Sequence, residues 1–323
     1  MGTFVKRLGQ LAARSLETES ANILKTTKAN KVPGSLSLKL DGTLKDGHDM
    51  KVFGLGTAAA LASLGAYSRF TVSMLRVYAA MEAELDGSKQ GPVSDLWAKH
   101  GDALRRSEAL ASDLEDVRSL GVAVDLGRDS PGTDAYVAAI RAAGKSHGGA
   151  GLLGHLYCRY LADLFGGQML GGPTKLALGL PRLPRHYHFD LGQSSRREYI
   201  ETLYADLNLA GERMPRDQVS SGAPAAAVCV CAADLRTLIH PLTRSLCLSL
   251  SLSLSLSLSL PLSPSLSLSL SLSADQFEAC VACAYGAFAH NAVVYREETP
   301  LALSAARGVA NVAAGAMAAP FRA

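Results

Sequence analysis

The apolar residues of this 323-residue chain recur at helical spacing, and that recurrence constrains its fold more than any other feature. The clearest case is the stretch RFTVSMLRVYAAMEAEL at residues 69–85. Its large apolar side chains fall at i, i+4, i+7, i+11 and i+15, which is one face of an α-helix. We expect this face to be buried, and it comprises Phe70, Met74, Val77, Met81 and Leu85.

Breaks rich in glycine and proline divide residues 35–216 into successive short helices. Alanine and leucine dominate the composition, and aromatic residues make up only 6 % of it. Because both residues favour helices, the sequence predicts an all-α protein. The breaks lie at Pro33–Gly34, Gly87–Pro92, Pro131–Gly132, Gly148–Gly151, Gly171–Pro173 and Pro181–Pro184.

Charge and cysteine content exclude several classes of protein. The net charge is +3 and the two signs are mixed along the chain, so a basic face for nucleic acid is not expected. The six cysteines lack the even spacing of a small secreted domain, which favours a reducing compartment. Cys280 and Cys283 form one CxxC without a second ligand pair, so a zinc site is not expected either.

A repetitive insertion interrupts the helical pattern. Residues 246–273 alternate serine and leucine almost throughout, after an alanine- and cysteine-rich lead-in from about residue 221. Strict alternation is formally a strand pattern, but a two-residue repeat within a helical domain favours an irregular insert. Helical periodicity resumes at Asp275, and one broad face of this helix comprises Phe277, Ala284, Phe288, Asn291 and Tyr295. We therefore predict an N-terminal extension (1–34), a helical domain (35–220), a low-complexity insert (221–273), the last helix of the domain (274–298) and an alanine-rich tail (299–323).

The two ends of the chain carry no clear targeting signal. The first segment has basic residues among helically spaced apolar ones but no continuous apolar core, so a transit-like extension and a surface helix both remain open. Near the other end, the stretch Leu301–Phe321 contains Arg307 and Asn311 and is only weakly apolar. It is a poor membrane span, and a loose amphipathic tail is expected there.

The stretch LLGHLYCRYLADLFGGQMLGGPTKLALGLP at residues 152–181 combines polar and small residues in an unusual way. Tyr157, Arg159 and Asp163 lie among leucines, where buried polar groups need partners. Gly166 and Gly167 follow in mid-pattern, where each glycine weakens a helix by about 1 kcal/mol relative to alanine. The pair predicts a kink that admits either a flat cofactor or a closely packed helix.

The segment HLYCRYLADLFGGQ, followed by LALGLP, resembles the distal-helix signature of the heme oxygenases. The resemblance continues in TDAYVAAIRAAGKSHGGAGLL, MLRVYAAMEAEL and FAHNAVVY, and so covers roughly residues 36–215 and 274–298. It implies an all-α fold that holds heme between a proximal helix and a kinked distal helix. It also implies oxidative opening of heme to biliverdin, carbon monoxide and ferrous iron.

Carried over by position, the resemblance assigns a role to several side chains. Asp163 becomes the catalytic aspartate, which orders the water that supplies protons, while Arg159 and Tyr78 hold that water chain. Tyr157 becomes the pocket tyrosine, which we also place among the catalytic residues, and Gly166 becomes the glycine of the kink. The remaining residues expected in the heme pocket are Ala162, Gly167, Phe288 and Asn291.

The proximal iron ligand implied by the resemblance is His48, the only histidine before Tyr78. It lies 30 residues before that tyrosine, three fewer than the family spacing, and an ordinary surface histidine is the alternative. Val52 stands where the family often has a glutamate that binds the ligand histidine.

Further departures lie around the expected pocket. Ala162 and Phe165 replace smaller residues of the signature, and both are expected to crowd the space above heme. Glu201 and Ala205 replace basic residues that bind the heme propionates, and this leaves Arg196 and Arg197 as the nearest substitutes.

The resemblance also implies partners: heme with its iron, and electrons from ferredoxin or an NADPH-dependent reductase. We expect a monomer with no strong membrane span, in a plastid or alternatively in the cytoplasm. A non-catalytic relative that binds heme or a bilin and has a regulatory role is the alternative function. A helical interaction protein without heme is a third.

Overall fold

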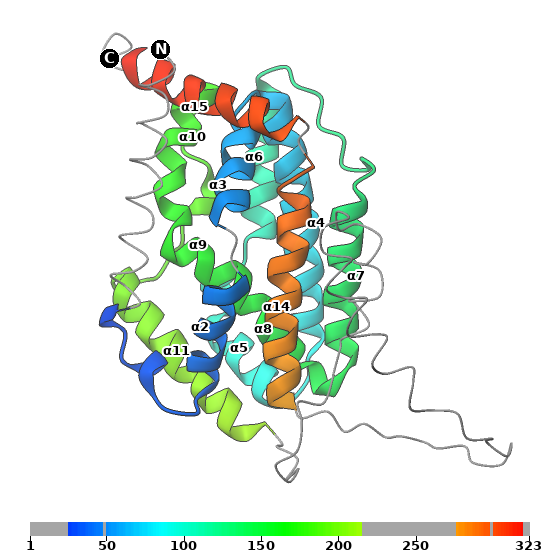
Figure 1. Cartoon of the computed structure of the whole chain (residues 1–323), viewed down its shortest axis with the longest axis vertical. Helices are drawn as coiled ribbons and strands as arrows, with labels where there is room; N and C mark the ends of the chain where they lie inside the picture. Colours follow the sequence, from blue (N-terminus) through cyan, green and yellow to red (C-terminus); the bar gives the residue numbers. More distant parts are fainter. Residues whose placement is uncertain (1–24, 48–49, 215–275, 298–299, 319–323) are drawn as a thin grey trace, which may run out of the picture.

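The computed structural model describes residues 25–47, 50–214, 276–297 and 300–318, and every regular element within these ranges is helical (Figure 1). The all-α prediction is therefore confirmed. The insert at 221–273 lies outside the described residues. The helices of the first half are α2 (Leu36–Gly47), α3 (Met50–Ala60), α4 (Leu64–Gly87), α5 (Pro92–Leu104), α6 (Ser107–Ser119) and α7 (Pro131–Lys145).

The described part of the second half contains a succession of short helical pieces between residues 147 and 187, followed by three long helices. The short pieces are η2 (His147–Gly149), α8 (Gly151–Leu156), η3 (Tyr157–Leu161), α9 (Ala162–Phe165), η4 (Gly167–Leu170), α10 (Gly171–Leu178) and η5 (Arg185–Tyr187). The long helices are α11 (Arg196–Arg213), α14 (Gln276–Val294) and α15 (Leu301–Ala318). A further short turn, η1 (Ala29–Lys31), precedes α2.

Serine caps explain where three of the long helices begin. The Ser63 hydroxyl accepts a hydrogen bond from the backbone N–H of Ala66 at the start of α4. Ser130 precedes Pro131 and caps α7 in the same way. At α11, Ser195 and Glu198 form a reciprocal capping box.

Helix α4 forms one wall of the core, against α6 and α7. Four of the five residues predicted for its buried face, Met74, Val77, Met81 and Leu85, are at most 3 % exposed, and Phe70 is partly buried. The 3.6-residue period of the sequence therefore identified the correct face.

Helix α14 returns to the centre of the molecule after the insert, and it packs against α2, α7 and α8 (Figure 1). Its buried residues include Phe277, Ala284, Phe288 and Asn291, as the periodicity after Asp275 predicts. The contact with α8 depends on Gly154, because a Cβ there would lie 2.2 Å from the Cys280 carbonyl oxygen. The last helix of the domain is thus part of the same core as the first.

Residues 301–318 form α15, which crosses α3 and α10 at one end of the bundle rather than lying as a loose tail (Figure 1). Its glycines allow close contact, since a Cβ on Gly308 would lie 1.7 Å from the Ala58 carbonyl oxygen and one on Gly315 would lie 2.2 Å from that of Leu176. Helices α14 and α15 are long and apolar enough to cross a membrane by length and composition alone, which is weak evidence for a span.

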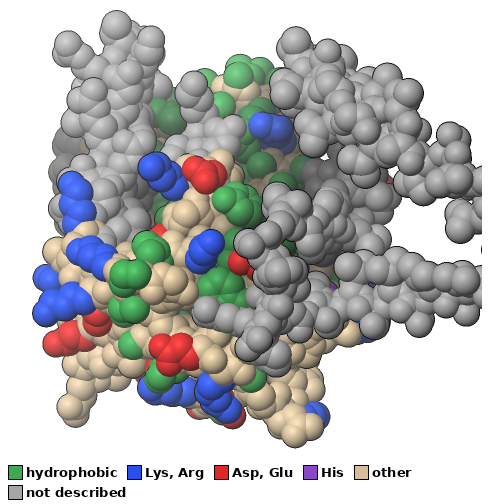
Figure 2. Space-filling model, turned by 60° about the horizontal axis from the view of Figure 1, so that its bottom comes forward, with side chains coloured by type: hydrophobic (Ala, Val, Ile, Leu, Met, Phe, Trp, Pro, Cys, Tyr) green, Lys and Arg blue, Asp and Glu red, His purple; other side chains and the backbone are tan. Residues whose placement is uncertain are grey.

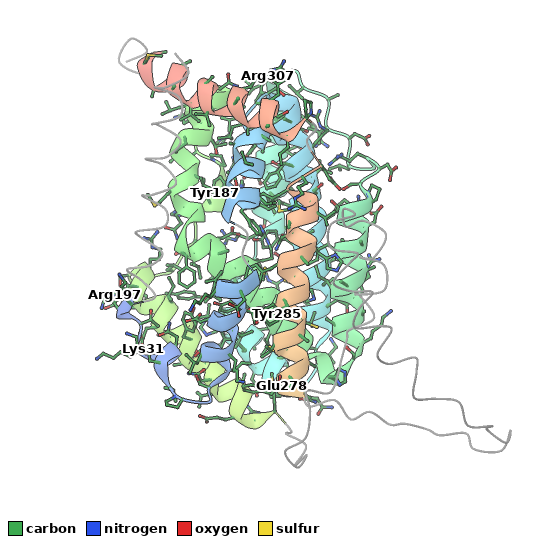
Figure 3. All side chains as sticks on the ribbon, in the orientation of Figure 1. Lys31, Tyr187, Arg197, Glu278, Tyr285 and Arg307 are labelled. Carbon is green, nitrogen blue, oxygen red and sulfur yellow. The ribbon has the colours of Figure 1, made fainter. Side chains whose placement is uncertain are left out.

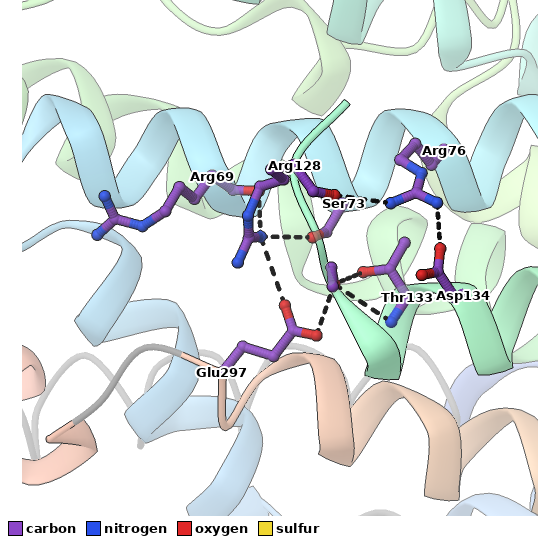
Figure 4. A network of polar contacts seen from close by, with 8 residues as sticks. Arg69, Ser73, Arg76, Arg128, Thr133, Asp134 and Glu297 are labelled. Atoms are coloured by element: carbon purple, nitrogen blue, oxygen red, sulfur yellow. Dashed lines mark hydrogen bonds and ion pairs between the residues drawn. The ribbon is translucent and has the colours of Figure 1, made fainter. Parts of the chain in front are cut away.

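A polar network fastens the loop before α7 to its neighbours (Figure 4). Nη1 of Arg128 donates to the Ser73 hydroxyl at 3.1 Å and contacts the Glu297 carboxylate at 3.4 Å. Ser130 donates to the same carboxylate at 2.6 Å. These contacts join α4, the start of α7 and the segment after α14.

The last part of the predicted N-terminal extension belongs to the packed structure. The backbone N–H groups of Lys28 and Ala29 donate to the Glu201 carboxylate of α11 at 2.8–3.1 Å. On the face drawn in Figure 2, basic and acidic side chains are interspersed over the described surface.

Candidate functional site

We use the name distal segment for residues 151–170. Its helical winding changes twice between residues 151 and 165. Helix α8 passes into one π-helical turn, η3, and then into the short α9. Gly166, with φ −132° and ψ −25°, ends α9, and a 3₁₀ turn begins at Gly167. The glycine pair therefore breaks the helix, as predicted, whereas nothing in the sequence indicated the π turn, a form that often occurs at functional sites.

One small face of the distal segment opens to solvent. Every residue from Gly151 to Leu161 is buried, and between there and the break only Ala162, Asp163 and Gly166 are partly exposed. These positions are i, i+1 and i+4, so they share one side of the helix. A carboxylate is thus flanked by two small residues on a surface that a flat group can approach.

Asp163 is joined to a buried polar network behind this face. The Tyr78 hydroxyl on α4 donates a short hydrogen bond to the Asp163 carboxylate. Nη2 of Arg159 donates to the same hydroxyl at 3.1 Å and lies 4.0 Å from Asp163. The structure therefore brings together Asp163, Arg159 and Tyr78, three residues that the resemblance assigned to one mechanism.

Arg159 is held from its other side by α14. Its Nη1 donates to the Asn291 side-chain oxygen at 3.2 Å, while the Asn291 amide donates to the Cys158 sulfur at 3.2 Å and contacts the Tyr136 hydroxyl at 3.4 Å. The Tyr136 ring in turn stacks on His290 at 5.5 Å. Asn291, predicted as a pocket residue, thus supports Arg159 directly.

The protonation states within the network suit proton donation. Burial, together with the Asp163 carboxylate, raises the pKa of Tyr78 well above its ordinary value, although the Arg159 charge opposes this shift. The tyrosine therefore stays protonated and acts as a donor to Asp163. Nε of Arg159 is buried without a hydrogen-bond partner among the described residues, which leaves one donor for a water or a bound group.

Tyr157, also predicted for catalysis, does not join this network. Its hydroxyl donates to Asp41 of α2 at 2.6 Å, and the Tyr204 hydroxyl of α11 donates to the same oxygen at 2.6 Å. The structure therefore separates the two tyrosines predicted for catalysis. Tyr78 faces Asp163, whereas Tyr157 faces the junction of α2 and α11.

His48, the predicted iron ligand, lies outside the described residues, between the end of α2 and the start of α3. Its neighbour Gly47 packs against the predicted pocket residue Phe288, because a Cβ on Gly47 would lie 3.3 Å from that ring. Tyr285, labelled in Figure 3, reaches Asp46 from the same helix with a contact of 3.4 Å. Val52, at the position where a histidine partner was expected, is buried.

Phe165 and Ala162, which differ from the family signature, lie in different surroundings. The Phe165 ring is buried, with its centroid 6.3 Å from that of Tyr204, so it packs toward α11. Ala162 remains on the open face beside Asp163. Gly167 is closely packed, since a Cβ there would lie 3.3 Å from the Asp163 side chain and 3.5 Å from the Tyr187 ring.

Sequence reasoning missed Tyr295 and Met74 as members of the site. The centroid of the Tyr295 ring lies 4.9 Å from that of Phe53 on α3 and 5.0 Å from that of Phe70 on α4. Burial raises the pKa of Tyr295, and the Arg159 charge opposes this shift. The Met74 sulfur lies 3.3 Å from Nη2 of Arg159. Both residues had been placed on apolar helix faces, and periodicity cannot show that such a face also meets a buried cation.

The described residues contain no group of three or more histidine, cysteine, aspartate or glutamate side chains that could hold a metal ion. The described residues do fit a flat group on the distal side, because small residues flank the open face and a carboxylate lies on it. Behind this face, Nε of Arg159 is a buried donor without a hydrogen-bond partner among the described residues. A metal brought in by a planar cofactor is compatible with this arrangement.

Comparison with known proteins agrees with this geometry. The family model for heme oxygenase matches residues 55–223. Heme oxygenase 1 of Gallus gallus is 33 % identical over 120 residues, which span 37 % of this chain and 39 % of the relative, well short of the relative's full length. The crystal structure of heme oxygenase-1 from the cyanobacterium Synechocystis, in complex with heme, has a similar fold with a TM-score of 0.53 and 20 % identity, over 90 % of this chain and 100 % of that chain. The chain belongs to the heme oxygenase family.

Proposed function

We propose that this protein binds heme against the open face of the distal segment and degrades it to biliverdin, carbon monoxide and ferrous iron. One observation carries the proposal: the buried network of Tyr78, Arg159 and Asn291 ends on Asp163, at a face where its neighbours are small. The fit of such a face to a planar ligand supports heme as the substrate. Family membership supports the reaction class.

Each residue of the network has its own role in the proposed reaction. Heme bound there would supply the iron at which dioxygen is activated and the ring that is opened. Asp163 lies on the open face, where its carboxylate accepts hydrogen bonds from ordered water and can pass on a proton. Tyr78 and Arg159 hold that carboxylate in one orientation, and Asn291 holds Arg159. The network thus holds a proton source on the open face of the distal segment.

The remaining parts of the proposal rest on the sequence. His48 would supply a nitrogen ligand to the heme iron, as the family resemblance implies, and in sequence it directly follows Gly47, which packs on Phe288. Electrons would come from ferredoxin or an NADPH-dependent reductase, and the protein would act as a monomer. A plastid location is supported only by the N-terminal extension, of which residues 1–24 lie outside the described ranges.

One spectroscopic experiment tests the proposal. Hemin is added to the full chain, a reductant follows, and the absorption spectrum is recorded over time. A Soret band that decays into the absorption of biliverdin is the expected result. A Soret band that persists under a competent reductant would indicate a non-catalytic heme-binding relative, and the lack of any Soret shift would contradict heme binding itself.

A further inference from the structure

The guanidinium group of Arg159 is a buried cation, and its terminal nitrogen Nη2 has two acceptors on helix α4. Nη2 carries two N–H groups, and the side chain does not give up its charge. It donates to the Tyr78 hydroxyl at 3.1 Å, and the Met74 sulfur lies 3.3 Å away as the second acceptor. Nη1 donates to Asn291 on α14 instead. Each N–H of Nη2 therefore has its own partner, and one of these partners is a thioether.

The place of Met74 on α4 explains why its sulfur reaches this nitrogen. Met74 lies four residues before Tyr78, so the two side chains are neighbours on one face of the helix. Met74 is 3 % exposed and Arg159 is 5 % exposed, so bulk solvent does not supply another acceptor for the N–H group. A thioether sulfur is a weak, polarizable and uncharged acceptor. The core thus offers a neutral partner to a charged donor.

The Asp163 carboxylate is a charged acceptor that lies close to the same nitrogen without being bonded to it. Its Oδ1 is 4.0 Å from Nη2, which is beyond hydrogen-bond distance. Its Oδ2 accepts from the Tyr78 hydroxyl. No residue that the structure describes donates a hydrogen bond to Oδ1. Because Asp163 is partly exposed on the open face, Oδ1 is the carboxylate oxygen that water can reach there.

Met74 and Asp163 compete for one N–H group of Arg159. Without the sulfur, that N–H would be a buried donor without an acceptor, which is unfavourable. A hydrogen bond from arginine to a carboxylate is stronger than one between neutral groups and is about 2.8 Å long, so the guanidinium would gain by moving roughly 1 Å toward Oδ1. This movement would occupy the oxygen on the open face.

We propose that Met74 is a positioning residue, whose sulfur holds Arg159 away from the Asp163 carboxylate and so leaves Oδ1 free on the open face. Arg159 then orients Asp163 only through the Tyr78 hydroxyl, from the buried side. The effect of Met74 on turnover rests on the proposed function. Its effect on the position of Arg159 does not, and the two are measured separately.

The position of Arg159 is tested in the protein without heme. Met74→Leu keeps a side chain of similar volume and removes the sulfur. Crystal structures of the full-chain wild type and variant give the distance between Nη2 and Oδ1 of Asp163, which should fall to about 2.8–2.9 Å in the variant. Met74→Ile, a second apolar variant, retains the test if Met74→Leu does not fold, which a thermal melt shows. An unchanged distance in the folded apolar variant would overturn the proposal.

Two matched variants separate the sulfur from core packing. Met81→Leu makes the same exchange at another buried position of α4, and it should leave the distance and the rate of biliverdin formation unchanged. Met74→Gln replaces the sulfur by an amide oxygen at similar reach, so the distance between Nη2 and Oδ1 should remain near the wild-type value. The same contraction in Met81→Leu or in Met74→Gln would overturn the proposal, since neither variant leaves Nη2 without its acceptor.

Turnover then tests the consequence for the proposed reaction. Met74→Leu should slow biliverdin formation about tenfold while the Kd for hemin changes by less than about twofold, because the side chain acts through Arg159. Met74→Gln should recover the rate to within about threefold of wild type. Equal losses in the two Met74 variants would overturn the role of the sulfur. If wild type binds hemin but forms no biliverdin, the proposed function fails, whereas the distances in the heme-free structures still decide the role of Met74.

Discussion

Nη2 of Arg159 lies 3.1 Å from the Tyr78 hydroxyl, and that hydroxyl donates onward to Asp163, so one buried cation orients a carboxylate through a tyrosine. Tyr78 on α4 and Arg159 in the distal segment are 81 residues apart in sequence. Because Asn291 anchors Arg159 from α14, three separate parts of the chain determine the orientation of one side chain.

Asp163→Ala should separate heme binding from heme degradation. The carboxylate faces water and lies in the proton path, so the Kd for hemin should change by less than about threefold while biliverdin formation falls by about 10²-fold or more. Asp163→Asn should be milder, since the amide keeps an acceptor and the shape of the side chain. Absorbance titration and the rate of biliverdin appearance measure the two effects. Biliverdin formation at the wild-type rate in Asp163→Ala would show that the network does not deliver protons.

His48→Ala tests the sequence-based assignment of the axial ligand. Loss of the imidazole should abolish biliverdin formation and shift the Soret band, and added imidazole should restore part of both by entering the vacated space. His188→Ala is a suitable control, because that histidine is exposed and lies outside the distal signature. An unchanged Soret band and unchanged turnover in His48→Ala would remove the assignment.

Gly154→Ala should destabilise the fold through the contact between α8 and α14. The added methyl would lie 2.2 Å from the Cys280 carbonyl oxygen and 2.7 Å from the Ala284 nitrogen, so the two helices must separate. We expect the free energy of unfolding to fall by about 1–3 kcal/mol. Gly286→Ala on α14 is the matched control, since no atom lies within 4 Å of its Cβ and helix propensity should raise stability by about 0.5–1 kcal/mol. Chemical denaturation of both variants measures the difference.

His100 should make the protein sensitive to mild acid. Burial lowers its pKa below 6.5, although its hydrogen bond to Asp206 opposes this shift, so the folded state binds a proton less readily than the unfolded state. The stability that it contributes is present above about pH 6.5 and is lost as the pH falls toward the lowered value. Denaturation curves at several pH values should show this decline in wild type and a smaller one in His100→Gln. Identical pH profiles would contradict the assignment.

Cys158 should resist alkylation in the folded protein. Burial raises its pKa to about 12, while the Arg159 charge and the Asn291 amide oppose this shift, so very little thiolate forms at pH 8. Iodoacetamide treatment followed by peptide mass spectrometry should leave Cys158 unmodified in native protein and modify it fully in guanidinium chloride. Rapid modification under native conditions would show that the segment opens to solvent.

The sequence alone determined the helical class, the buried faces of α4 and α14 and the break at Gly166, because each depends on local spacing that a helix expresses wherever it packs. The signature also indicated that Asp163 and Arg159 belong to one site. Only the tertiary structure decided that Tyr78 meets Asp163 while Tyr157 meets Asp41, since a tyrosine's partner depends on which helix lies opposite it. Only the tertiary structure decided the conformation of residues 301–318, because the sequence shows no more than a weakly apolar stretch there. They form a packed helix because Gly308 and Gly315 let α15 approach the backbone of α3 and α10, and that complementarity lies in segments far apart along the chain.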